Sequence, residues 1–133
     1  MVAAVLSGKI VDNGDLGWWI EGAFDERTGH YHPNEKFPDL RGMVEQLQDQ
    51  GLKVLLWCAA LHHLDAIAEQ PFVKQHLLQS AKIDPNERFL CPRCQPVHDY
   101  VRSMVDHLMR TWGIDGLKID FIDPYQDRYS APC

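Results

Sequence analysis

The feature that most constrains the fold of this chain is a pattern that occurs twice: an amphipathic helix, a glycine, and then a short apolar run. In the first copy, apolar residues at i, i+3, i+4 and i+7 predict a helix over residues 38–50: Leu40, Met43, Val44 and Leu47. In the second copy, apolar residues keep the helical period up to Gly113: Val97, Tyr100, Val101, Met104, Val105, Leu108, Met109 and Trp112. The apolar runs that follow, at 52–57 and 114–122, predict two strands.

A third and shorter strand is predicted at 9–12, ahead of the first helix. The order strand, helix, strand, helix, strand predicts an α/β fold of consecutive parallel βαβ units. The connections from strand to helix, 13–37 and 58–95, are much longer than those from helix to strand. Ligand-binding loops follow the carboxyl ends of parallel strands, so the residues at those ends indicate a site: Asp12, Trp57 and Asp120.

The composition is that of one ordinary soluble globular domain. Of 133 residues, 45% are hydrophobic and 24% are charged, and the formal net charge is -6. The basic residues are scattered along the chain, so we expect no nucleic-acid partner. The apolar run 2–6 is too short for a secretory signal, and no stretch approaches the ~20 apolar residues of a membrane span. We therefore expect a cytoplasmic protein with no membrane partner.

Cysteine usage gives weak evidence for a metal site. Four cysteines are present, and without a secretory signal we expect them to be reduced: Cys58, Cys91, Cys94 and Cys133. Cys91 and Cys94 form a C-x-x-C pair, and His98 could be a third ligand. A structural zinc site needs four ligands, so two half-buried thiols before a helix are the favoured interpretation. We expect no metal and no cofactor.

The last predicted strand carries two charges on one face. Because strand side chains alternate, Lys118 and Asp120 share a face, and three apolar side chains share the other: Leu117, Ile119 and Phe121. A neighbouring ammonium favours the ionised form of a carboxylate, which would keep Asp120 available as a nucleophile at neutral pH. The alternative is a buried structural ion pair.

Two long segments carry a family resemblance: "EKFPDLRGMVEQLQDQGLKVLLW" and "LCPRCQPVHDYVRSMVDHLMRTWGIDGLKIDFID". They resemble the barrel domain of retaining α-galactosidases of the melibiase clan of glycoside hydrolases, whose pattern runs D-D-G-W, F-P-D-x-x-x-L, G-L-K-x-x-L-W and G-x-D-x-L-K-x-D. The resemblance covers residues 12–123 and implies a partial TIM (β/α)8 barrel with about three consecutive parallel strands. It also implies a carbohydrate substrate with terminal α-linked galactose, cleaved by double displacement.

The resemblance implies a role for each matching residue. Asp120 would attack the anomeric carbon, Lys118 would hydrogen-bond sugar hydroxyls, and Trp57 would line the sugar subsite unless it only caps the interior. The stretch "VDNG" matches D-D-G-W, so Asp12 and Asn13 would contact sugar hydroxyls. Because an amide replaces the family's second carboxylate there, a different sugar selectivity is expected.

The remaining polar residues of the long connection are interpreted as surface groups. His62 and His63 are adjacent and have no i+4 partner that would complete a metal pair, so we expect solvated loop histidines. Three carboxylates are interpreted as surface charges: Asp65, Asp123 and Asp127.

Half of the catalytic machinery has no match in the chain. Retaining glycosidases use two carboxyl groups about 5–5.5 Å apart, and the family takes its acid/base from a later strand. A (β/α)8 barrel needs ~250 residues, so residues 1–133 are expected to form a single incomplete barrel domain that is inactive alone. We expect this domain to need the missing barrel half or to self-associate.

Other functions remain open. One is an α-glucosidase or α-xylosidase of the same clan, and another is a non-catalytic, truncated sugar-binding module. A zinc or redox module built on the C-x-x-C pair is less favoured.

Overall fold

A computed structural model describes residues 3–6, 31–63, 69–78, 88–120 and 122. The predicted strand at 9–12 lies outside the described residues, and so do several residues singled out above: Asp12, Asn13, Asp65, Phe121, Asp123, Asp127 and Cys133.

Both predicted helices are confirmed, as α1 (Leu40–Asp49) and α4 (Gln95–Trp112). Helix α1 begins after Asp39, whose carboxylate accepts a hydrogen bond from the backbone N–H of Gly42 at 2.9 Å. Helix α4 ends at Gly113, which has φ 67. This left-handed conformation costs a glycine nothing, because glycine has no Cβ to clash with the backbone.

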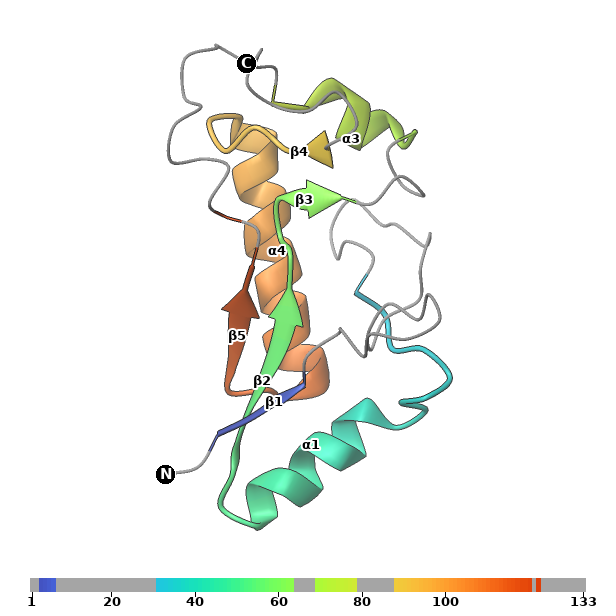
Figure 1. The fold of residues 1–133 in the computed structure, drawn as a ribbon, viewed down its shortest axis with the longest axis vertical. Coiled ribbons are helices and arrows are strands. Elements are labelled where there is room, and N and C mark those ends of the chain that lie inside the picture. The colour runs from blue at the N-terminus through green and yellow to red at the C-terminus, as the bar shows by residue number, and fades with distance from the viewer. Residues whose placement is uncertain (1–2, 7–30, 64–68, 79–87, 121, 123–133) are drawn as a thin grey trace.

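The strands form a parallel sheet of three, in the order β1 (Ala3–Leu6), β2 (Lys53–Cys58) and β5 (Gly116–Ile119) (Figure 1). Strands β2 and β5 confirm the two strands predicted after the helices, although β5 covers only part of the predicted run. Strand β1 lies in the apolar run 2–6, which the sequence pattern did not identify as a strand. The α/β class is therefore confirmed.

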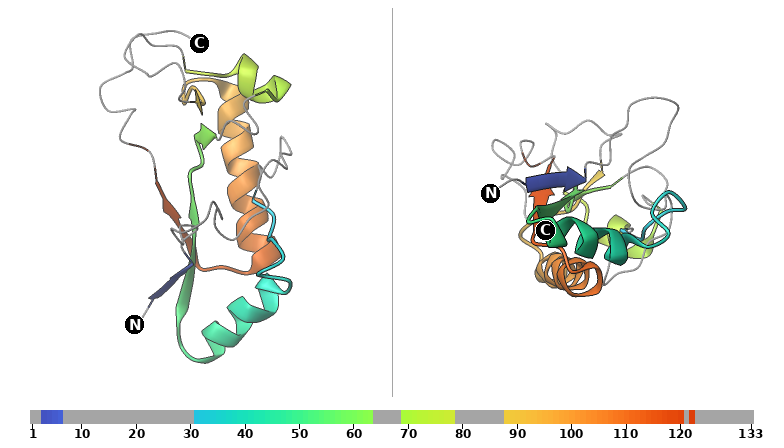
Figure 2. Two further views of the ribbon diagram at one scale, coloured as in Figure 1. Left: turned by 45° about the vertical axis from the view of Figure 1, so that its right-hand side comes forward. Right: turned by 90° about the horizontal axis from the view of Figure 1, so that it is seen from below.

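The core lies between the sheet and the two long helices, which cover the same side of the sheet (Figure 2). Three alternate side chains of β2 are fully buried there: Val54, Leu56 and Cys58. The apolar stripe of α4 faces them with its own buried residues: Val97, Tyr100, Met104 and Leu108. Burial raises the pKa of the Cys58 thiol to about 12, so this cysteine is a neutral core residue.

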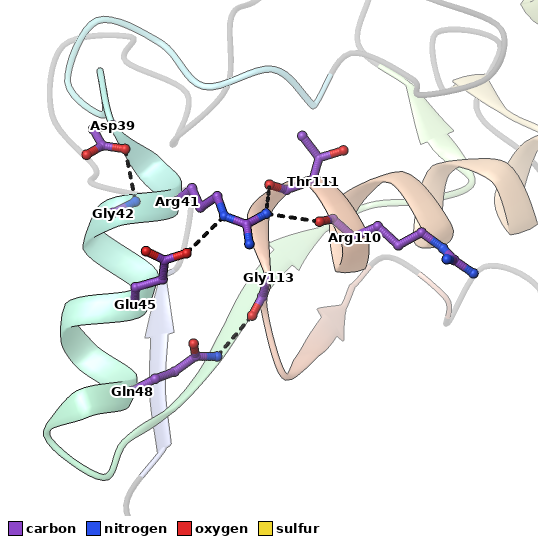
Figure 3. Close-up of polar contacts among 8 residues, drawn as sticks. All are labelled: Asp39, Arg41, Gly42, Glu45, Gln48, Arg110, Thr111 and Gly113. Carbon is purple, nitrogen blue, oxygen red and sulfur yellow. Dashed lines mark hydrogen bonds and ion pairs between the residues drawn. The ribbon is translucent and has the colours of Figure 1, made fainter.

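Helices α1 and α4 are joined by side chains of α1 that reach the end of α4 (Figure 3). The Arg41 guanidinium donates hydrogen bonds to the carbonyl oxygens of Arg110 at 3.3 Å and of Thr111 at 3.2 Å. The Gln48 side chain donates to the carbonyl oxygen of Gly113 at 2.9 Å. The last carbonyls of a helix have no partner within the helix, so α1 satisfies groups that α4 cannot satisfy itself.

The long connection between β2 and α4 holds a small structure beyond the carboxyl ends of the sheet strands (Figure 1). Strands β3 (His62–His63) and β4 (Arg88–Phe89) pair antiparallel, and α3 (Pro71–Gln75) lies between them in the chain. His62 belongs to β3 and is half-buried, with its ring 4.7 Å from that of Phe89. The expectation of a solvated loop histidine is therefore wrong for His62, because the connection folds back on itself and packs its side chains.

The C-x-x-C pair lies just before α4. Cys91 is a buried thiol outside any disulfide, whereas Cys94 is disulfide-bonded and is the residue that precedes the helix. The expectation that all cysteines are reduced is therefore wrong at Cys94. Within the described part of the chain, no group of three or more histidine, cysteine, aspartate or glutamate residues could hold a metal ion.

No helix in the described ranges is long and apolar enough to cross a membrane.

Candidate functional site

Three residues predicted from the sequence meet at the carboxyl ends of β2 and β5. The indole N–H of Trp57 donates a hydrogen bond to Asp120 Oδ2 at 2.9 Å. The Lys118 ammonium donates to the same oxygen at 3.2 Å. The structure therefore brings Trp57, Lys118 and Asp120 into one cluster, although Trp57 is far from the other two in the chain.

Strand register explains why these three side chains share a face. Trp57 on β2 is paired with Lys118 on β5, and paired residues of neighbouring parallel strands point to the same side of the sheet. Asp120 comes two residues after Lys118 and therefore points to that side as well. The buried side chains of β2, such as Leu56, point to the opposite side, toward the helices. The cluster thus lies on the face of the sheet that α1 and α4 do not cover.

The backbone holds Asp120 in place. Its N–H donates to the carbonyl oxygen of Cys58 at 2.9 Å, which extends the hydrogen bonding between β2 and β5 by one residue. The side chain and the main chain of Asp120 are thus both bound to the last two residues of β2.

The charged pair is partly open to solvent. The side chain of Lys118 is 51% exposed and that of Asp120 is 44% exposed. The pair is therefore not buried in this chain, and its role as a nucleophile or as a structural ion pair stays a prediction. An ion pair this exposed contributes little to the free energy of folding, so its stability contribution alone does not explain why the two charges lie together.

The apolar face of β5 is less buried than predicted. Ile119 is paired with the fully buried Cys58, yet its side chain is 46% exposed. Leu117 on the same face is half-buried. The helices therefore cover β2 fully but β5 only in part.

A second carboxylate, Asp115, lies at the amino end of β5 and has a different environment. Its Oδ1 accepts from the Lys53 ammonium at 2.8 Å, and its Oδ2 accepts from the Gln48 side chain and the Val54 N–H, both at 2.9 Å. These hydrogen bonds, that from Lys53 most of all, lower the pKa of Asp115 from its usual 3.8 to about 2. Asp115 connects α1, β2 and β5, which is a structural role that the sequence analysis did not identify.

The carboxyl end of β2 has one further buried partner that the sequence analysis missed. The hydroxyl oxygen of Tyr31 accepts a hydrogen bond from the Ala59 N–H at 2.8 Å. The Tyr31 side chain is fully buried. Its only signal in the sequence is that of an aromatic residue in the long connection before α1.

Comparison with known proteins finds no relative. No protein-family model matches this chain, and no curated protein or solved structure matches it. The likeness to retaining α-galactosidases therefore stays a prediction.

Proposed function

We propose that this chain forms part of the barrel domain of a retaining, α-galactosidase-like glycoside hydrolase, with Asp120 as the nucleophile. The observation that carries the proposal is the placement of the Asp120 carboxylate. It follows a parallel strand at its carboxyl end and points away from the helices. In a (β/α)8 barrel the helices are outside, so that face is the barrel interior, and active sites lie at the carboxyl ends of the strands.

The hydrogen bonds to Asp120 suit a nucleophile. Two donors, Trp57 Nε1 and Lys118 Nζ, bind one carboxylate oxygen and so orient the group. Donors of this kind favour the anionic form of a carboxylate, which is the form that attacks. In this proposal Trp57 orients Asp120 by hydrogen bonding, in addition to lining the sugar subsite. Lys118 is half exposed and would also reach sugar hydroxyls.

The reaction is double displacement. A carboxylate oxygen of Asp120 bonds to the anomeric carbon as the bond to the leaving oxygen breaks, and a carboxylic acid protonates that oxygen. Water, deprotonated by the same acid/base group, then releases the sugar and restores Asp120. We assign the acid/base to a further βα unit, supplied by the missing barrel half. Asp12 and Asn13 would contact the sugar hydroxyls.

A leaving group that needs no protonation tests the nucleophile without the acid/base. We expect a fluorinated α-galactoside with a dinitrophenolate leaving group to label the 133-residue chain covalently, with the label mapped to Asp120 by peptide mass spectrometry. Asp120→Asn should abolish the label. Asp106→Asn, which makes the same chemical change on the exposed surface of α4, should be labelled like the wild type.

Three outcomes would contradict this assignment. Labelling that survives in Asp120→Asn would exclude Asp120 as the nucleophile. Faster labelling by the matched α-glucoside would favour an α-glucosidase of the same clan. Calorimetric binding of galactose without any labelling would favour a non-catalytic sugar-binding module.

A further inference from the structure

A single peptide group at the end of β2 lies between Tyr31 and the candidate nucleophile. Its N–H belongs to Ala59 and donates to the Tyr31 hydroxyl oxygen at 2.8 Å. Its carbonyl belongs to Cys58 and accepts from the Asp120 N–H at 2.9 Å. The two ends of this peptide group are therefore bound to Tyr31 and to Asp120.

The planarity of the peptide group couples these two contacts. Because the N–H and the C=O of one peptide are held in a common plane, fixing the direction of the Ala59 N–H fixes the direction of the Cys58 carbonyl. Hydrogen bonds at both ends of a peptide also polarise each other. The position of the Tyr31 hydroxyl therefore acts on the Asp120 backbone through one rigid unit.

The surroundings of this peptide group favour a fixed orientation. Cys58, Ala59 and Ala60 are all buried, so water does not compete for the Ala59 N–H. The chain turns directly afterwards, where the His62 N–H donates to the Ala59 carbonyl oxygen at 3.0 Å. Burial raises the pKa of the Tyr31 hydroxyl well above its usual value, so it stays neutral at physiological pH.

The side chain of Asp120 is tied to the same stretch of β2. Trp57, which donates to Asp120 Oδ2, immediately precedes Cys58. A rotation of the peptide group between Cys58 and Ala59 would therefore disturb the hydrogen bond from the Asp120 N–H. It would also shift the end of β2, which carries Trp57, the indole donor to the Asp120 carboxylate.

We propose that Tyr31 is a positioning residue, which fixes the orientation of Asp120 through the peptide group between Cys58 and Ala59. The functional meaning of this coupling rests on the proposed role of Asp120, whereas the coupling itself is measurable without any sugar.

The coupling is tested by comparing amide hydrogen exchange, measured by NMR, between the wild-type chain and Tyr31→Phe. We expect exchange at the Ala59 and Asp120 amides to accelerate about tenfold relative to the Met104 amide, which reports global opening from the centre of α4. The Trp57 indole N–H should accelerate in parallel. Val44→Ala removes buried side-chain atoms from the same core, on α1, and should leave these ratios unchanged.

Two results would overturn the proposal. One is acceleration at Ala59 with no change at Asp120. The other is an equal effect of Tyr31→Phe and Val44→Ala, which would mean that Tyr31 only contributes to the core.

A second measurement covers the case in which Tyr31→Phe does not fold. Site-specific 3-fluorotyrosine at position 31 keeps the ring and the hydroxyl but makes the oxygen a weaker acceptor. The amide proton signals of Ala59 and Asp120 should then both move upfield, because the two hydrogen bonds polarise one peptide group. An Asp120 signal that stays in place while the Ala59 signal moves would overturn the coupling. If both amide signals move but no sugar labels Asp120, the proposed function is overturned and the coupling between Tyr31 and Asp120 stands.

Discussion

At the scale of single residues, β5 places two carboxylates in opposite roles. Asp115 at its amino end has three hydrogen-bond donors from α1 and β2, and it joins those elements. Asp120 beyond its carboxyl end is half exposed and is bound by Trp57 and Lys118. In barrel enzymes the amino-end face serves stability and the carboxyl-end face serves chemistry, and under the proposed function Asp115 and Asp120 would follow that division.

The depressed pKa of Asp115 predicts how stability depends on pH. The pKa is about 2 in the folded chain and 3.8 when unperturbed, so the unfolded state binds the proton first as pH falls. The contribution of Asp115 is therefore complete above about pH 4 and is lost as pH falls toward about 2. In urea unfolding, the stability difference between wild type and Asp115→Asn should shrink across this window. A difference that stays constant from neutral pH to pH 2 would contradict the assignment.

At the scale of helices and strands, side chains of α1 supply hydrogen-bond donors to the carboxyl end of α4. Arg41 and Gln48 lie seven residues apart on α1 and donate to carbonyl oxygens at the end of α4 (Figure 3). This arrangement sets the position of α1 against the link that leads into β5. Because that link also carries Asp115, the junction of the helices and the start of β5 are one connected unit.

Removal of the guanidinium tests this junction. Arg41→Ala should lower the free energy of unfolding by about 1 kcal/mol, because two carbonyl oxygens lose their donor. Urea denaturation with an unchanged m-value would measure the loss. Arg102→Ala removes an exposed arginine whose ion pair with Asp99 lies within α4, and it should cost less than about 0.5 kcal/mol. Equal losses in the two variants would show that Arg41 acts only as a surface charge.

At the scale of the whole molecule, the described sheet has helices on one side only. Parallel sheets are normally covered on both faces, and the outer strands of an open sheet leave backbone groups ready to pair. Exposed apolar side chains occur on and just after β5, where Ile119 is 46% exposed and Ile122 is 52% exposed. Ile119 is paired with Cys58 and so points to the helix side of the sheet, where the helices cover β5 only in part; the proposed barrel would cover it with a further βα unit.

The exposed apolar surface at β5 predicts self-association of the isolated chain. In sedimentation velocity, the average mass should rise between micromolar and submillimolar concentrations, because apolar surface is buried between copies. Ile119→Lys should shift the population toward monomer. Met109→Lys changes an exposed apolar residue on α4 and should leave the association unchanged. A monomer that unfolds cooperatively at every concentration would contradict the incomplete-barrel proposal.

Much of the local structure followed from local chemistry. Periodicity located both long helices, and the predicted span 38–50 and the predicted end at Gly113 agree with the structure within two residues. Strand alternation alone placed Lys118 and Asp120 on one face. Short apolar runs were harder, because the four residues of β1 carry no period long enough to distinguish a strand from other structure.

Contacts between distant segments could not be read from the chain. The hydrogen bond from Trp57 to Asp120 depends on the register of β2 against β5, and a shift of one residue would turn Trp57 to the other face. The contact of Tyr31 with Ala59 depends on how a long connection returns to the end of β2. Strand alternation and helical periodicity depend on residues that are close in sequence. Strand register and side-chain packing depend on the free energy of the whole folded core. The pairing of charges on β5 was therefore a property of the sequence, and the partners of Asp120 on β2 were a property of the fold.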